Sequence, residues 1–240
     1  VGCESADIHL HGKARLEIGD EQGLSTASLV VRGGTTLRIY EKGVCWIYPG
    51  SSLVIENGGR VILSGEGGLR NLGGQIVLKE GGELIYQMGY CSLESEDATV
   101  QLQGGLVHLL PNAHLNWTPV DDQTGRIEVF QNQFSEFYLE TGAEMRLNGN
   151  DEQDVILAIE PGAFCDQVSY FDAHVIFAQG NLMLGKNASM KWRADLTGKK
   201  LKIEAIQGNN EEVNLITEKN HIDLYHATMK NIKWSSNAIS

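Results

Sequence analysis

The sequence predicts an all-β fold, a parallel β-solenoid with three short strands in each coil of about 23 residues. Three observations predict it. Glycine pairs recur at a fixed interval, the apolar residues between them keep one register, and no apolar period of 3.6 residues persists over three helical turns. Residues that match at a fixed interval indicate strands that stack on their counterparts in the next coil.

The glycine pairs set the length of the repeat. Gly58-Gly59, Gly81-Gly82 and Gly104-Gly105 follow one another at equal intervals, and each interval is one repeat long. Glycine adopts the positive φ of a sharp corner without steric cost, so we expect these pairs at the corners of successive coils.

Apolar residues follow each glycine pair in the same register. They form two columns, one of Val61, Leu84 and Val107, and one, two residues later, of Leu63, Tyr86 and Leu109. Residues two apart in a strand point to the same face. We therefore expect both columns to be buried.

Each coil is expected to hold three strands of four or five residues. Apolar strand positions from Leu37 to Leu115 recur in steps of about 8 residues, with turns between them such as Pro49-Gly50, Gly73-Gly74 and the glycine cluster at 65–68. A β-sandwich or barrel also spaces its strands by roughly 8–12 residues, but it does not predict that equivalent strands recur at every third step. The solenoid is therefore favoured.

We expect a single β-solenoid domain over residues 1–240, with regular coils at about 33–118 and irregular, loop-bearing coils at about 119–240. The later strands are spaced about 10 residues apart, which predicts wider coils, and 120–125 has the polar, acidic composition of a loop. The strands expected in this half are 126–130, 136–140, 144–147, 154–160, 174–178, 181–184, 189–192, 201–206, 212–216, 221–226 and 229–234.

The four cysteines, Cys3, Cys45, Cys91 and Cys165, form no CxxC pair, which excludes a ribbon-type zinc site and a dense disulfide framework. Cys45 and Cys91 are separated in sequence by twice the repeat, so we expect them at equivalent places two coils apart. Strands stack about 4.8 Å apart, which separates the two backbones by about 9.6 Å and exceeds the ~7 Å between Cα atoms that a disulfide spans. We therefore expect two free, buried thiols.

Composition excludes several functional classes. The 31 acidic residues outnumber the 19 Lys and Arg and give a net charge of −12, so we expect no nucleic-acid partner. No run of about 18 or more apolar residues is present, so we expect no transmembrane segment. The chain opens at Val1 without Met or a basic segment, which predicts a processed product or part of a longer chain. No amphipathic helix follows the last expected strand to cap the stack, so we expect the chain either to continue past Ser240 or to dock against a partner in a larger assembly.

The phrase PGSSLVIENGGRVIL, residues 49–63, resembles the turn-and-strand phrasing of right-handed parallel β-helix segments. Such segments are common in large secreted or surface-attached proteins of Gram-negative bacteria, including adhesin-like proteins. The resemblance covers about 33–117 well. It implies a stiff, repetitive bacterial protein located outside the cell or at the cell surface.

The sequence Asp7-Ile8-His9-Leu10-His11 is similar to the metal-binding strand of amidohydrolases, in which alternate histidines face a metal. Those enzymes require an α/β-barrel that supplies further ligands from other strand ends, and no helical pattern follows here. We therefore expect two histidines on the exposed face of a first strand, and neither a metal nor a cofactor.

Parallel β-helices also include polysaccharide lyases and hydrolases. The adjacent acids Asp121 and Asp122, on a predicted loop, are the candidates for such chemistry, together with acids in the 148–154 loop. That second loop is also rich in oxygen ligands suited to Ca²⁺, although it lacks the order of an EF-hand, and a solvated turn is favoured. No catalytic set accompanies these acids, so we expect no enzyme.

Two aromatic residues are the candidates for binding. If Cys45 and Ile47 point inward, then Trp46 and Tyr48 point outward, where they could stack on a sugar ring or anchor a protein partner. The alternative is that a loop or a neighbouring domain covers them.

The favoured function is that of a non-catalytic structural or adhesive segment of a secreted bacterial surface protein, with a protein partner or a surface glycan. One alternative is a polysaccharide-active enzyme. Another is a cargo or subunit bound within a larger secretion or cell-surface assembly.

Overall fold

The computed structural model describes residues 7–95 and 97–119, and beyond them 125–129, 134–140, 143–148, 155–159, 164–169, 174–184, 189–194, 201–205, 214–217, 221–225, 227–230 and 233–236. Side chains are described as far as residue 115, and after it at 127, 135–138, 140, 143 and 145.

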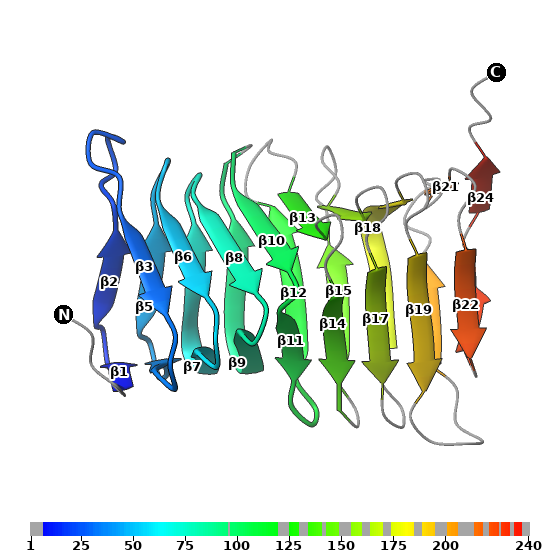
Figure 1. Cartoon of the computed structure of the whole chain (residues 1–240), viewed down its shortest axis with the longest axis horizontal. Coiled ribbons are helices and arrows are strands. Elements are labelled where there is room, and N and C mark those ends of the chain that lie inside the picture. The colour runs from blue at the N-terminus through cyan, green and yellow to red at the C-terminus, as the bar shows by residue number, and fades with distance from the viewer. Residues whose placement is uncertain are drawn as a thin grey trace.

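The strands stack in parallel along the long axis of the molecule, so that the colour in Figure 1 passes from blue at one end to red at the other. They form three columns, here called columns 1, 2 and 3, because each strand pairs with its counterparts in the preceding and following coils. This arrangement confirms the predicted all-β parallel solenoid. Within the described ranges no helix has the length and hydropathy needed to cross a membrane.

Column 1 contains β1 (Asp7–Leu10), β4 (Thr36–Ile39), the first parts of β7 (Arg60–Asn71) and β9 (Glu83–Leu93), β11 (Leu106–Leu109), β14 (Phe134–Leu139), β17 (Phe164–Ser169), β19 (Ser189–Ala194) and β22 (His221–Tyr225). Column 2 contains β2 (Arg15–Ile18), β5 (Val44–Ile47), the second parts of β7 and β9, β12 (His114–Pro119), β15 (Glu144–Asn148), the first part of β18 (His174–Leu184), β20 (Leu201–Ala205) and β23 (Ala227–Lys230). Column 3 contains β3 (Ser28–Val31), β6 (Ser52–Ile55), β8 (Gln75–Lys79), β10 (Thr99–Gln103), β13 (Gly125–Val129), β16 (Val155–Ile159), the second part of β18, β21 (Asn214–Thr217) and β24 (Lys233–Ser236).

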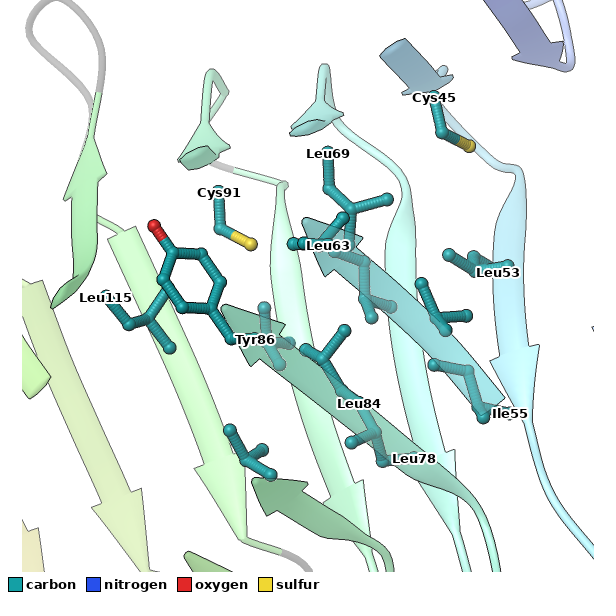
Figure 2. Packing of buried hydrophobic residues seen from close by; sticks show 14 of the residues in the cluster. Cys45, Leu53, Ile55, Leu63, Leu69, Leu78, Leu84, Tyr86, Cys91 and Leu115 are labelled. Atoms are coloured by element: carbon teal, nitrogen blue, oxygen red, sulfur yellow. The ribbon is translucent and has the colours of Figure 1, made fainter. Parts of the chain in front are cut away.

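The register predicted from the glycine pairs is confirmed. In column 1, Val61 pairs with Leu84 and Leu84 with Val107, and two residues later Tyr86 pairs with both of its predicted neighbours. The side chains of both apolar columns are buried, and Figure 2 shows Leu84 and Tyr86 within the core. The hydroxyl of Tyr86 reaches the carbonyl oxygens of Gly89 and His114, at 2.5 and 3.0 Å, so the polar end of this core residue has acceptors.

The sequence interval between paired residues differs from one coil to the next. Glu83 pairs with Leu106, but Leu106 pairs with Glu136 and Glu136 with Asp166, and both of these later intervals are longer than the first. Three strand-and-turn steps of about 10 residues each account for the longer interval. These two coils are therefore longer than the one before them, but the next coil is shorter again, since Phe164 pairs with Ser189.

The two glycines of each corner pair have different structural roles. The first has a positive φ in every pair, +77° at Gly58, +74° at Gly81 and +91° at Gly104. The second lies against the preceding coil: a Cβ at Gly59 or Gly82 would come closer than 3.0 Å to the carbonyl oxygen of Val31 or Ile55. Both glycines are therefore required, one for chain direction and one for close approach.

Several predicted boundaries are wrong. The glycine cluster at 65–68 does not end a strand, since β7 continues through it with a shift of register between Leu63 and Gly68. The cluster is needed because a Cβ at Gly67 would collide with the backbone of Gly43 in the preceding coil. β17 was not predicted at all, because its sequence FCDQVS lacks a clear alternation of apolar and polar residues. The expected strands 174–178 and 181–184 form one strand, β18, and 229–234 is divided between β23 and β24.

Cys45 and Cys91 occupy equivalent places in column 2, each paired with Leu69 of the coil between them. Both are free and buried, as predicted, and both point into the core beside Leu69 in Figure 2. Burial raises the pKa of each thiol from 9.0 to about 12. Cys3 and the side chain of Cys165 lie outside the described residues.

Candidate binding face

Trp46 lies on the outer side of column 2. Its neighbours in β5, Cys45 and Ile47, are fully buried, so the alternation of the strand directs the indole outward. In the ladder, Trp46 pairs with Glu17 of the preceding coil and Arg70 of the following one. Three coils therefore contribute to this face.

Two arginines cover the indole of Trp46. The guanidinium carbon of Arg15 lies 4.4 Å from the ring centroid and that of Arg70 lies 4.7 Å from it, both within the range of a cation–π interaction. The indole Nε1 is buried and has no hydrogen-bond partner among the described residues. We call Arg15, Trp46, Arg70 and Glu94 the tryptophan face.

Arg70 is held in place by Glu94. Its Nε donates to Oε1 of Glu94 at 2.7 Å, its Nη2 donates to Oε2, and Ser92 Oγ donates to the same carboxylate at 2.5 Å. Burial disfavours ionisation of Glu94, but hydrogen bonds from Arg70 and Ser92 outweigh it and lower the pKa of this carboxyl group. The hydrogen bond to Glu94 in turn raises the pKa of Arg70, against the effect of burial. This is a fixed, bidentate ion pair.

Tyr48 does not belong to the exposed part of this face. It contacts Trp46 edge-on, with ring centroids 6.1 Å apart, but only 4% of its surface is exposed. The loop that precedes β3 packs on the same corner, where Ala27 N donates to Ser51 Oγ at 3.1 Å. The prediction that Tyr48 is exposed is therefore wrong. Its burial agrees with the alternative that another part of the chain covers the ring.

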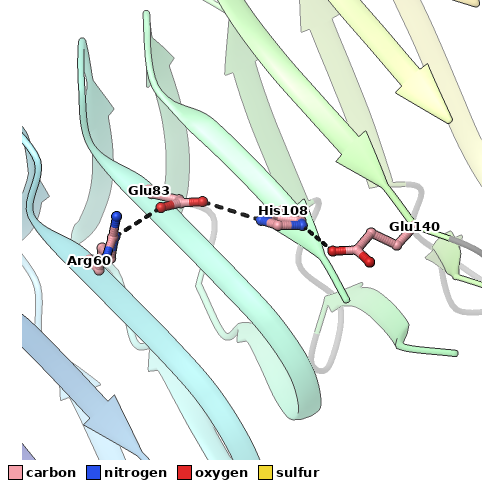
Figure 3. Close-up of polar contacts among 4 residues, drawn as sticks. All are labelled: Arg60, Glu83, His108 and Glu140. Atoms are coloured by element: carbon pink, nitrogen blue, oxygen red, sulfur yellow. Dashed lines mark hydrogen bonds and ion pairs between the residues drawn. The ribbon is translucent and has the colours of Figure 1, made fainter. Parts of the chain in front are cut away.

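A second polar cluster lies on the outer side of column 1 (Figure 3). Arg60 Nε lies 3.1 Å from Glu83 Oε2, and the other oxygen of Glu83 lies 3.2 Å from His108 Nδ1. His108 Nε2 lies 2.7 Å from Glu140 Oε1. The chain Arg60–Glu83–His108–Glu140 thus connects four successive coils through side chains alone.

His9, in β1, and His11, just after that strand, both have aromatic contacts. His9 lies edge-on to Tyr40 at 5.9 Å and His11 stacks on the same ring at 5.7 Å. Both are exposed, as predicted. Across the part of the chain that the structure describes, no three His, Cys, Asp or Glu side chains are grouped so as to hold a metal ion.

Most of the other candidate site residues predicted from the sequence lie outside the described part of the chain. Asp121, Asp122 and residues 149–154 lie outside the described residues, and Asn148 is the last residue of β15. Met88 and Tyr90 on β9 are exposed apolar residues that the sequence did not single out, at 52% and 36% exposure.

The sequence reasoning missed Arg70 and Glu94, although a signal for Arg70 was present. Arg70 occupies the place of Trp46 in the next coil, and the same register that located the core would have located it.

No protein-family model matches the chain, and neither a curated protein nor a solved structure shows significant similarity to it.

Proposed function

We propose that this chain is a non-catalytic, stiff segment of a secreted bacterial surface protein, located outside the cell, that carries an adhesive face for a surface glycan or a protein partner. The β-helix phrasing of residues 49–63 supports the location, and the parallel stack supports the mechanical role.

One observation carries the structural part of the proposal: ion pairs on the outer surface join one coil to the next. The two partners of each pair lie one coil apart in sequence, and the pairs are Arg60–Glu83, Lys79–Glu56, Arg70–Glu94 and Lys42–Glu66. Charged side chains used in this way reinforce the stack along its axis. Their individual contributions are small where they are exposed, but they repeat along the chain.

The tryptophan face supports the adhesive part. Trp and Arg are the residues most enriched where proteins bind partners, and an aromatic ring beside a guanidinium also suits a sugar that carries a carboxylate. Arg15 is half exposed, so part of this face is open to a partner.

Binding of the whole chain to arrays of glycans and matrix proteins tests the adhesive part. We expect at least one ligand whose binding falls tenfold or more in Arg15→Gln and in Trp46→Ala. The matched control is Arg38→Gln, which removes an arginine from the outer side of column 1 and should leave binding unchanged. An array with no bound ligand would contradict adhesion. Turnover of an acidic polysaccharide, abolished by Asp121→Asn/Asp122→Asn, would contradict the non-catalytic role.

A further inference from the structure

His108 contacts a carboxylate with each of its two ring nitrogens, and these carboxylates belong to different coils (Figure 3). Nδ1 faces Glu83 of β9 at 3.2 Å, and Nε2 faces Glu140, which follows β14, at 2.7 Å. The three side chains are partly buried, with 19% of His108, 21% of Glu83 and 28% of Glu140 exposed. The imidazole thus lies between the preceding and the following coil.

The number of hydrogen bonds at this position depends on the protonation of the ring. A neutral imidazole has one N–H, so it donates to one carboxylate and turns a lone pair toward the oxygen of the other. A protonated imidazole donates at both nitrogens and carries the positive charge that both carboxylates favour. Only the protonated ring satisfies both contacts.

The other groups around His108 do not change this dependence of its hydrogen bonds on protonation. Tyr138 of β14 lies edge-on to the imidazole at 4.9 Å, and Glu136 lies two residues earlier on the same side of that strand. Arg60 of β7 pairs with Glu83 and offsets part of its charge. Among the described residues, the basic side chain that contacts Glu140 is His108.

We propose that His108 is a proton-dependent clamp that joins three successive coils of the solenoid. Proton uptake by the imidazole converts the second contact into a hydrogen bond and stabilises the stack. Proton loss breaks that hydrogen bond again. A shared metal is not the explanation, because the two carboxylates approach different nitrogens of the ring.

The melting temperature of the whole chain, measured at pH 8.5 and pH 6.0, tests the clamp. This range spans the titration of an unfolded imidazole, near pH ~6.5, and keeps glutamates ionised. Because the clamp belongs to the protonated ring, its stabilisation appears as the pH falls and is lost as the pH rises. We expect the difference in melting temperature between the natural chain and His108→Gln to be about 2–4 °C larger at pH 6.0 than at pH 8.5.

Two further variants sharpen the test. Glu140→Gln removes one of the two charges that His108 faces and should reduce this pH-dependent difference. His9→Gln replaces an exposed histidine whose described contact is the ring of Tyr40, and its effect should be the same at both pH values. An equal effect of His108→Gln at both pH values would overturn the clamp. If that variant does not fold, ¹⁵N spectra of the natural chain decide: a ring that is neutral at pH 6.0 overturns it, and two protonated nitrogens support it.

Discussion

At the scale of single residues, the solenoid places each core side chain between its equivalents in the coils before and after it. Leu84 lies between Val61 and Val107, and none of its surface is exposed. Its neighbour in the strand, Ile85, points outward and is only partly buried. Adjacent residues of one strand therefore differ sharply in what a substitution should cost.

Leu84→Asp should strongly destabilise the fold. The substitution removes a buried leucine and places a carboxylate in an apolar column, so we expect a loss of roughly 4 kcal/mol or more in the free energy of unfolding. Denaturant unfolding followed by circular dichroism measures it. Ile85→Asp is the matched control and should cost much less, and an equal loss in both variants would contradict the register.

Cys45 and Cys91 should be unreactive toward maleimide in the folded chain at pH 8 and react fully once it is unfolded. The reason is that burial raises both pKa values from 9.0 to about 12, so the nucleophilic thiolate is scarce. Above pH 9 the unfolded chain loses these protons while the folded chain keeps them, so stability should fall between pH 9 and about 12. Peptide mapping by mass spectrometry reads the labelling. A Cys45–Cys91 disulfide, or rapid labelling of the folded chain, would contradict the assignment.

At the scale of strands and corners, the second glycine of each pair allows neighbouring coils to stack closely. A Cβ at Gly82 would meet the backbone of Ile55, whereas one at Gly33, whose φ is +61°, would have no atom within 4 Å. The two positions separate the effect of backbone contact from that of backbone conformation.

Gly82→Ala should therefore destabilise the chain more than Gly33→Ala. The second variant bears only the cost of a left-handed conformation, about 1–2 kcal/mol, while the first forces two coils apart. Melting temperatures of the two variants compare them directly. A larger loss in Gly33→Ala would show that corner conformation, and not the approach of the coils, limits the stack.

The ion pairs between strands also differ in how much stability their loss should cost. Arg70→Gln leaves the carboxylate of Glu94, with 9% of its side chain exposed, without its bidentate partner, so we expect a loss of about 1–3 kcal/mol in unfolding free energy. Lys42→Gln is the matched control: its pair with Glu66 is long, at 3.6 Å, and both side chains are about 70% exposed, so the loss should be below ~0.5 kcal/mol. Equal losses would indicate that Glu94 finds another partner.

At the scale of the whole molecule, local repetition is what made the fold predictable. Val61, Leu84 and Val107 recur at one interval, and one interval is enough to infer parallel stacking, buried columns and the separation of Cys45 from Cys91. The burial of Tyr48 could not be inferred in this way, because β5 ends at Ile47 and the inward–outward alternation of that strand does not extend to the next residue.

The candidate sites were harder to predict than the core for a related reason. Outward side chains alternate with the core residues, and some of their contacts follow the register, as from Arg60 to Glu83, but others run diagonally across coils, as from Glu83 to His108. A pattern of apolar residues carries no information on such diagonal pairs. The partners of His108 therefore required the structure.

Each coil contacts the coils beside it, so a local defect should remain local. Leu84→Ala leaves a cavity without adding a charge, and the stack should open first in column 1 at β7, β9 and β11. We expect amide hydrogen exchange there to become roughly tenfold faster or more, while β3 and β6, in column 3 nearer the N-terminus, keep their protection. Ile85→Ala, which removes an outward side chain from the same strand, should change exchange little. An equal acceleration at every described strand in Leu84→Ala would show instead that the whole stack opens as one cooperative unit.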